Sequence, residues 1–334
     1  MSHNGPTDPH EAPASRAIHL TIRHQPKIRR VDNFLGQRYG AFSRTFFQRL
    51  IKAGKLRANG RRVSASYRVQ AGDVLDFELP VLPERIIKPV AMDLDVVHED
   101  DDILVVNKPA GIMCHPGKKN RDDTLASGLI YHMHGDAEGK FNPGIVHRLD
   151  FDTTGVMVVA KHRRAHVHLS RQFETRGVEK EYVALARGCV RRRVGRIEVS
   201  IGYSPLRWGL MSTADDAKSP RPAVSVYHVL ERFPAHTLVS VVPKTGRRHQ
   251  IRVHFEFIGH PLIGERYYRA NLAADPLEAV MPRLALHAWR LRITHPTTRE
   301  PIEFTAELPA DFAAALDHLR AHGAQGPATP PTPP

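Results

Sequence analysis

The sequence predicts an α+β protein in which a small basic module precedes a larger domain built on a mixed, largely antiparallel β-sheet. The 334 residues give room for two hydrophobic cores rather than one. Short helical and hairpin patterns fill the first quarter of the chain. From about residue 90, apolar runs of strand length alternate with polar turns. Many strands with a few interspersed helices are typical of the α+β class.

Composition and charge indicate a globular protein with a polyanionic partner. Hydrophobic residues make up 41% of the chain and charged residues 25%, as in ordinary folded domains. The chain has 48 Lys and Arg against 35 Asp and Glu, which leaves a net charge of +13. Clustered cations bind a phosphate backbone and release its counterions, so this balance favours a nucleic acid. A basic solvated surface without function is the alternative.

Other bulk features concern the compartment and the chain ends. The only cysteines are Cys114 and Cys189, so we expect no disulfide framework and a reducing, cytoplasmic environment. We find no signal-peptide core and no apolar run long enough to span a bilayer, so we expect no membrane attachment. Residues 1–26 and 323–334 contain several prolines and lack apolar periodicity, which predicts disordered tails. Residues 81–89 are predicted to link two domains.

The basic module is placed at residues 27–80. It contains 12 Lys or Arg and 4 Asp or Glu, a local charge of +8, so most of the excess charge lies in a short stretch. Val31, Phe34 and Leu35 recur at the spacing of one short amphipathic helix. Ser43 is predicted to be the N-cap of a second, basic helix.

A basic hairpin is predicted to follow the two helices. Asn59 and Gly60 would form the turn between two short strand-like runs in residues 56–63, and residues 74–77 would add a closing strand. Two helices and a basic hairpin suit the backbone of structured RNA, although a small capping domain with solubilising charges is the alternative. The cations expected to contact RNA are Arg44, Lys52, Lys55, Arg57, Arg61 and Arg62.

Three stretches of this module carry a family resemblance. They are Ser43-Arg44-Thr45, residues 51–60 with the sequence Ile-Lys-Ala-Gly-Lys-Leu-Arg-Ala-Asn-Gly, and Gly72-Asp73. On these residues the module resembles the αL RNA-binding domain of the ribosomal protein S-four type. The resemblance implies a small α/β RNA-binding domain ahead of the larger domain.

The larger domain is placed at residues 90–322. Strands are predicted at 103–106, 156–160, 181–187, 224–230 and 238–242, and helices at 162–176, 247–258 and 309–322. The run at 156–160 is apolar at every position, which predicts a strand buried on both faces.

The segment 144–155 places an acid beside basic groups, directly before that buried strand. Asp150 follows His147 and Arg148 within three residues. Basic neighbours would keep a carboxylate ionised at neutral pH, as a nucleophile or a general base requires. From the residues alone, Asp152 could serve equally, and either could be an ordinary turn or cap residue.

The same segment resembles the signature of the RluA, RluC and RluD branch of RNA pseudouridine synthases. In that family the aspartate of His-Arg-Leu-Asp is the invariant catalytic group, which corresponds to Asp150. Further matches follow in order: Lys180-Glu181-Tyr182, residues 245–254, residues 259–264, the loop 108–117 and, more weakly, residues 286–288. The chain departs from the family in having Thr154 for the usual Ser and Glu265 for the usual Asp.

The resemblance implies the pseudouridine synthase fold and a role for each matched residue. Asp150 would act first in the reaction, Arg252 would pair with Asp150, and Tyr182 would stack on the flipped uracil and help remove the proton from its fifth carbon. Arg148 would fill the space that the uridine vacates or hold a flanking phosphate. The remaining expected contacts to the RNA backbone are His147, Arg247, Arg248 and His249.

The implied reaction is an isomerisation without redox change, so we expect no cofactor. Histidines 162, 166 and 168 lie on a predicted helix, but neither cysteine forms a Cys-x-x-Cys pair, so we expect no metal. Ribosomal RNA of the large subunit is the favoured substrate, transfer RNA is the second candidate, and we expect a monomer. A non-catalytic RNA-binding ribosome-assembly factor is the rival function. A third possibility, a glycosidase, would require two carboxylates several ångströms apart, and Asp150 and Asp152 are too close in sequence to suggest such a pair.

Overall fold

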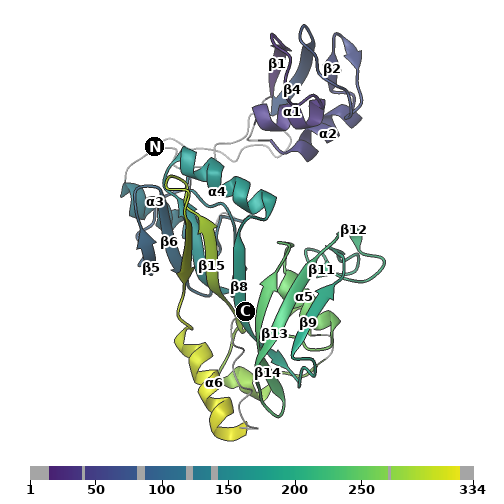
Figure 1. The fold of residues 1–334 in the computed structure, drawn as a ribbon. Coiled ribbons are helices and arrows are strands. Elements are labelled where there is room, and N and C mark those ends of the chain that lie inside the picture. Colours follow the sequence, from purple (N-terminus) through teal and green to yellow (C-terminus); the bar gives the residue numbers. More distant parts are fainter. Residues whose placement is uncertain are drawn as a thin grey trace, which may run out of the picture. The chain divides into compact units, whose positions relative to one another are not determined.

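The computed structural model describes residues 15–39, 42–80, 87–117, 123–136, 142–269 and 272–323. The chain forms two compact units, Met1–Arg85 and Ile86–Pro334 (Figure 1). The predicted linker at 81–89 and the predicted tail at 323–334 lie largely outside the described residues.

The N-terminal unit packs two helices on a small antiparallel sheet. The helices are α1 (Val31–Arg38) and α2 (Arg44–Lys52), and the sheet has the order β1 (Ser15–Thr21), β4 (Val74–Pro80), β2 (Leu56–Ala58) and β3 (Arg61–Arg62). Ser43 caps α2 as predicted, because its hydroxyl accepts a hydrogen bond from the Phe46 amide at 3.2 Å. Leu35 and Phe47 are fully buried in the core of this unit.

Strand β1 corrects the prediction that residues 1–26 form a disordered tail. Ser15 to Thr21 pair along their whole length with β4, antiparallel. Ile18 and Leu20 point toward the core of the unit, as alternate residues of a strand do. They are the only two residues of β1 that pack against that core. Strand β1 forms only by pairing with β4, which lies more than 50 residues later in the chain. No local sequence pattern therefore predicts this strand. Residues 1–14 lie outside the described residues.

The larger unit is organised around one nine-stranded sheet. Its order is β5 (Val96–Glu99), β6 (Ile103–Lys108), β7 (Thr154–Ala160), β15 (Leu286–Thr294), β8 (Glu179–Arg187), β14 (His236–Pro243), β13 (Val224–Arg232) and β9 (Val194–Glu198), with β16 (Pro301–Thr305) beside β15. Within the described residues, only β7 and β15 pair parallel. The predicted mixed, largely antiparallel sheet is confirmed.

Four helices cover both faces of this sheet. They are α3 (Leu125–His134), α4 (Arg163–Thr175), α5 (Gln250–Phe257) and α6 (Ala310–Gly323). Strand alternation decides which helix each residue meets: Val105 packs with the α4 cluster and Leu104 with the α3 cluster. In the other half of the sheet, Ala184 joins the α5 cluster and Leu185 joins the α6 cluster.

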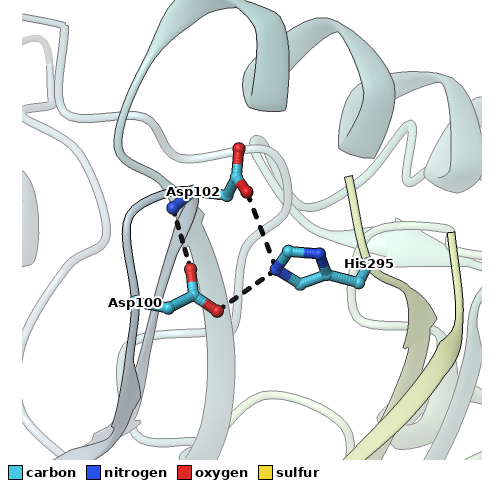
Figure 2. Close-up of side chains that lie close together, drawn as sticks. All are labelled: Asp100, Asp102 and His295. Carbon is cyan, nitrogen blue, oxygen red and sulfur yellow. Dashed lines mark hydrogen bonds and ion pairs between the residues drawn. The ribbon is translucent and has the colours of Figure 1, made fainter. Parts of the chain in front are cut away.

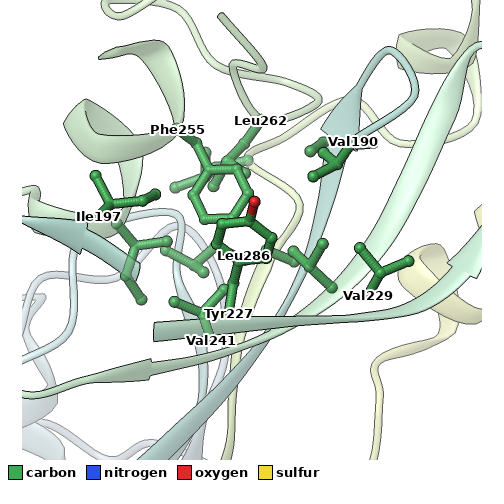
Figure 3. Close-up of a cluster of buried hydrophobic side chains, with 13 residues drawn as sticks. Val190, Ile197, Tyr227, Val229, Val241, Phe255, Leu262 and Leu286 are labelled. Atoms are coloured by element: carbon green, nitrogen blue, oxygen red, sulfur yellow. The ribbon is translucent and has the colours of Figure 1, made fainter. Parts of the chain in front are cut away.

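The core beneath α5 holds the functional end of that helix in place. Figure 3 shows Phe255 packed among side chains that include Tyr227, Val241 and Leu262. Phe255 is fully buried and its ring meets Tyr227 edge to face, with centroids 5.8 Å apart. Burial of this face fixes the helix against the sheet, so its first turn is held rigidly above the strands.

Several elements of the larger unit were not predicted. Helix α3 has six consecutive buried residues, Leu125 to Ile130, so it lacks the polar face that makes a helix recognisable. The short strands β10 (Ile201–Tyr203), β11 (Met211–Ser212) and β12 (Lys218–Arg221) form a separate three-stranded sheet. A 3₁₀ turn covers Pro276–Ala279. Among the described helices, none is long and apolar enough to cross a membrane.

Candidate active site

Asp150 lies in a tight loop directly before β7. The Thr153 amide donates to the Asp150 carbonyl at 3.2 Å, and the Asp150 side chain is 20% exposed. Lys108, at the end of β6, stabilises the loop. Its ammonium group donates to the carbonyls of Pro109 at 2.7 Å and Phe151 at 3.1 Å. Lys108 is fully buried, and burial lowers the pKa of its ammonium group to about 8.

The parallel contact between β7 and β15 places this loop. Thr154 lies opposite His287, and its hydroxyl is 2.8 Å from Nδ1 of that ring. Gly155 has φ 116°, and a Cβ there would collide with the carbonyl oxygen of Ala288. The glycine is therefore required where the two backbones approach, and the hydroxyl of Thr154 makes a structural contact.

Arg252, on α5, bridges two carboxylates. Its Nη1 donates to Asp150 Oδ2 at 3.1 Å, while Nε and Nη2 donate to the two oxygens of Glu265 at 2.6 and 2.8 Å. Glu265 is 1% exposed. Burial would lower the pKa of Arg252, but the hydrogen bonds from its guanidinium to Glu265 outweigh burial and raise the pKa above its ordinary value. The family resemblance points to Arg252, but nothing in the sequence indicates that Glu265 holds it.

Tyr182, on β8, reaches the same cavity from the sheet. Its ring packs against the core clusters on both sides of the site. Burial, and secondarily the charge of Asp150, raise the pKa of its hydroxyl well above the ordinary value, so the side chain is a neutral phenol. Within the described residues, this hydroxyl has no hydrogen-bond partner.

His249 caps α5 in a left-handed conformation, with φ 55°. Its Nε2 lies 3.9 Å from Asp150 Oδ1, and its Nδ1 lies 2.6 Å from the hydroxyl of Tyr268. Burial lowers the pKa of His249 to about 4, although Asp150 acts in the opposite direction. The imidazole is therefore neutral near pH 7. The sequence predicts that His249 contacts the RNA backbone, whereas the structure places its ring beside the Asp150 carboxylate.

Three adjoining cavities surround these residues. Asp150, Tyr182 and Arg252 line a cavity of about 330 Å³. A second of about 650 Å³ shares Tyr182 with it, and a third of about 660 Å³ shares Asp150. Arg148 lines all three, and it forms no hydrogen bond or ion pair with any described residue. The arrangement offers a positioned carboxylate, a fixed cation and a neutral phenol, with space on both sides for a longer ligand.

Comparison with known proteins shows which family this chain belongs to. Residues 102–257 match the family model described as RNA pseudouridylate synthase, and residues 29–75 match the S4 domain model. An uncharacterized RNA pseudouridine synthase of Bacillus subtilis, YlyB, is 38% identical over 308 residues, which are 92% of this chain and 99% of that relative. This chain belongs to the RNA pseudouridine synthase family. Its N-terminal module is an S4 domain, as predicted.

Other relatives of this synthase agree. Ribosomal large subunit pseudouridine synthase D of Pseudomonas aeruginosa is 38% identical over 301 residues, 87% of this chain and 92% of that relative. The structure titled Human RNA Pseudouridylate Synthase Domain Containing 1 has a TM-score of 0.54 and 30% identity over 70% of this chain and 90% of its own. Human RNA Pseudouridylate Synthase Domain Containing 4 has a TM-score of 0.55 and 27% identity over 67% and 92%. The expected fold is confirmed.

The expected RNA contacts of the synthase differ in their surroundings. Arg248 and Arg148 are exposed, and Arg247 donates to the Pro222 carbonyl at 3.2 Å beside two of the cavities. The His147 ring stacks on Phe173 and accepts a hydrogen bond from the backbone of β7, so it has a structural contact that the sequence did not indicate. The exposed cations of the S4 domain include Arg44, Lys52, Lys55, Arg57, Arg61 and Arg62. Their contacts with RNA stay predictions.

A second cluster of titratable groups lies away from Asp150 in sequence. Figure 2 shows Asp100, Asp102 and His295 together. Asp100 accepts from the backbone amides of Asp102 and Ile103, both at 2.8 Å, and lies 3.2 Å from the His295 ring. Burial would raise the pKa of Asp100, but hydrogen bonds from His98 and these amides outweigh it and lower the pKa to about 2. The cluster ties the β5–β6 turn to the end of β15.

Proposed function

We propose that this synthase isomerises uridines of large-subunit ribosomal RNA and that Asp150 is its essential catalytic residue. The observation that carries the proposal is the convergence of Asp150, Tyr182 and Arg252 on one cavity. These residues come from a loop, a strand and a helix spread over about 100 residues of sequence. Relatives named ribosomal large subunit pseudouridine synthase D, in Pseudomonas aeruginosa and Vibrio parahaemolyticus, support the choice of RNA.

The reaction breaks the glycosidic carbon–nitrogen bond, turns the uracil and joins its fifth carbon to the ribose. The product is an isomer, so the protein must supply only positioning, charge and proton transfer. The Asp150 carboxylate acts first, by attack on the ribose or the base or by removal of a ribose proton. Arg252 fixes its orientation, since Glu265 holds two arms of the guanidinium and leaves Nη1 for Asp150.

Tyr182 meets the flipped uracil on its ring face and with its hydroxyl. The raised pKa keeps the phenol protonated, so a free phenolate is not the acting base near pH 7. The hydroxyl has no partner in the described protein, and it can therefore receive the proton from the fifth carbon while it releases its own to a neighbouring acceptor. Asp150 lines the same cavity as Tyr182, so its carboxylate is the acceptor that we propose for this proton.

A uridine reaches this cavity only after it has left its stack. Arg148 is exposed, lines all three cavities and has no hydrogen bond or ion pair within the described residues. It is therefore available to occupy the vacated space or to bind a flanking phosphate. The S4 domain adds exposed cations for the RNA backbone, which supports a large structured RNA as the substrate.

Transfer RNA is the second candidate substrate, and the rival from another class is an assembly factor without activity. The retained set of Asp150, Tyr182 and Arg252 weighs against an inactive protein. We infer a cytoplasmic location, supported by two cysteines without a disulfide and by relatives named for ribosomal RNA.

The test is a pseudouridine map of total RNA from cells that lack the protein. The cells are complemented with wild type, Asp150→Asn or, as a matched control, Asp152→Asn. The Asp152 side chain lies two residues away and forms no hydrogen bond or ion pair with a described residue. We expect one or a few large-subunit sites to disappear and to return with wild type and Asp152→Asn only. Restoration by Asp150→Asn would refute the catalytic assignment, and lost sites in transfer RNA would correct the substrate.

A further inference from the structure

The loop between β10 and β11 presents an almost fully exposed tryptophan. Trp208 is 90% exposed, and Leu206 in the same loop is 89% exposed. An indole gains more than most side chains from burial, so an exposed position forgoes a large stabilisation. A lone exposed apolar side chain is common on protein surfaces, so the case for a binding role rests on the surroundings of Trp208.

The loop is built to hold this position. The Ser204 amide donates to the Leu210 carbonyl at 2.9 Å, and the Leu210 amide donates to the Arg207 carbonyl at 3.1 Å. Arg207 in turn donates from Nη1 to the Tyr267 carbonyl at 2.6 Å. These bonds close the loop on itself and attach it to the segment after Glu265, so the indole is displayed on a fixed support.

The support is connected to the catalytic carboxylate. The Tyr268 hydroxyl accepts from the Met211 amide at 2.9 Å, directly after the loop, and lies 2.6 Å from His249. His249 is the residue whose Nε2 is 3.9 Å from Asp150. Trp208 also lines the cavity of about 660 Å³ that contains Asp150. The exposed ring thus has a fixed relation to the reacting centre.

The chemistry of this cavity selects an RNA as the occupant. Arg148, Arg248 and Arg252 line it together with Trp208. Cations beside an exposed aromatic ring suit a single-stranded nucleic acid, because the cations bind phosphates and the ring stacks on a base of any identity.

We propose that Trp208 is a base-stacking residue, and that its indole receives a nucleobase next to the flipped uridine. This inference rests on the proposed function, since it assumes that RNA enters the cavity of Asp150. Trp208 lies outside the short motif stretches on which the family resemblance rests, so it would be an additional recognition element. Stacking on the indole would hold the RNA strand open beside the site while the uridine is turned.

Turnover gives the first test, with an in vitro transcript of large-subunit ribosomal RNA as substrate. Stacking of one base corresponds to roughly a five- to hundredfold change in binding, so we expect Trp208→Ala to lower kcat/KM about tenfold or more. Trp208→Phe keeps a stacking ring and should stay within about threefold of wild type. Leu206→Ala, equally exposed in the same loop, should not change turnover. Equal kcat/KM for wild type and Trp208→Ala would overturn the proposal.

Fluorescence gives a test that does not depend on turnover. The chain has two tryptophans, so Trp289→Phe leaves Trp208 as the only indole. In an Asp150→Asn background, the transcript should quench the emission of Trp208, whereas Trp289 alone, in a Trp208→Phe protein, should respond little. Unchanged Trp208 emission at saturating RNA overturns stacking. Absence of pseudouridine with wild type, despite quenching, would instead refute the proposed function. If Trp208→Ala modified the transcript at the wild-type rate but lost activity on ribosomal particles, Trp208 would contact a protein rather than a base. That result would also overturn the proposal.

Discussion

Glu265 holds Arg252 by two hydrogen bonds, at 2.6 and 2.8 Å, and leaves the third arm of the guanidinium to Asp150. The carboxylate of Glu265 also accepts from the backbone amide of Tyr267 at 2.8 Å. A residue that the family usually has as aspartate therefore organises both the cation of the site and the start of the following loop. The position of Arg252 beside Asp150 therefore depends on its buried pairing with Glu265.

Glu265→Gln should damage stability and turnover together. The change keeps the shape but removes the charge that compensates a buried guanidinium, which costs about 3 kcal/mol of unfolding free energy. Arg252 would also lose its orientation toward Asp150, so we expect kcat to fall by at least about tenfold. Glu265→Asp keeps the charge and should lose less of both. Denaturant unfolding and single-turnover rates measure the two effects, and wild-type kcat in Glu265→Gln would contradict this account.

Tyr182→Phe should separate binding from chemistry. The ring still stacks on the uracil, so KM should remain within about threefold. The variant lacks the hydroxyl that we propose relays the proton, and acid–base steps of this kind contribute on the order of 100-fold or more, so kcat should fall strongly. Tyr182→Leu removes the ring as well and should raise KM in addition. A Tyr182→Phe enzyme with wild-type kcat would limit this residue to stacking.

His249 should make stability depend on pH on the acid side. Its pKa is about 4 in the folded protein and 6.5 ordinarily, so the unfolded chain binds a proton more readily. The free energy of unfolding therefore has its full value above about pH 6.5. It decreases by about 2–3 kcal/mol through this residue as the pH falls toward 4. His249→Gln should flatten the curve of unfolding free energy against pH over that window. His228→Gln, at an exposed position on β13, should leave the curve as in wild type.

The parts of the fold that the sequence predicted have local causes. Ser43 precedes an amphipathic run, and the structure places its hydroxyl on the Phe46 amide. The run at 156–160 is uniformly apolar, and it is a strand buried on both faces. Helix α3 and strand β1 escaped because their stability comes from distant partners rather than from a period of their own.

The residues of the candidate site are likewise only partly predictable from the sequence. The family resemblance was needed to identify Asp150, Tyr182 and Arg252. Asp150 and Arg252 are 102 residues apart in the chain, and no sequence pattern predicts that their side chains lie 3.1 Å apart. In the sequence, Glu265 is only a departure from the family pattern, and its hydrogen bonds to Arg252 become evident only in the folded structure. His249 sits in a run of basic residues that favours an RNA contact, but its left-handed backbone turns it toward Asp150. A positive φ at a residue other than glycine is uncommon and cannot be predicted from the identity of that residue.

The S4 domain should contribute affinity that salt weakens. Arg61 and Arg62 are adjacent, exposed arginines on β3. If both neutralise phosphates, the double change to glutamine should reduce the slope of log affinity against log salt by roughly 1.5, since each contact contributes about 0.7–0.9. Arg191 and Arg192 are an equally exposed pair in the larger unit, and their change to glutamine is the matched control. Binding of the Asp150→Asn protein to the transcript at several salt concentrations measures the slopes. Equal slopes for wild type and the Arg61, Arg62 variant would mean that β3 does not touch the RNA backbone, whereas a smaller slope with unchanged kcat would assign this strand to binding alone.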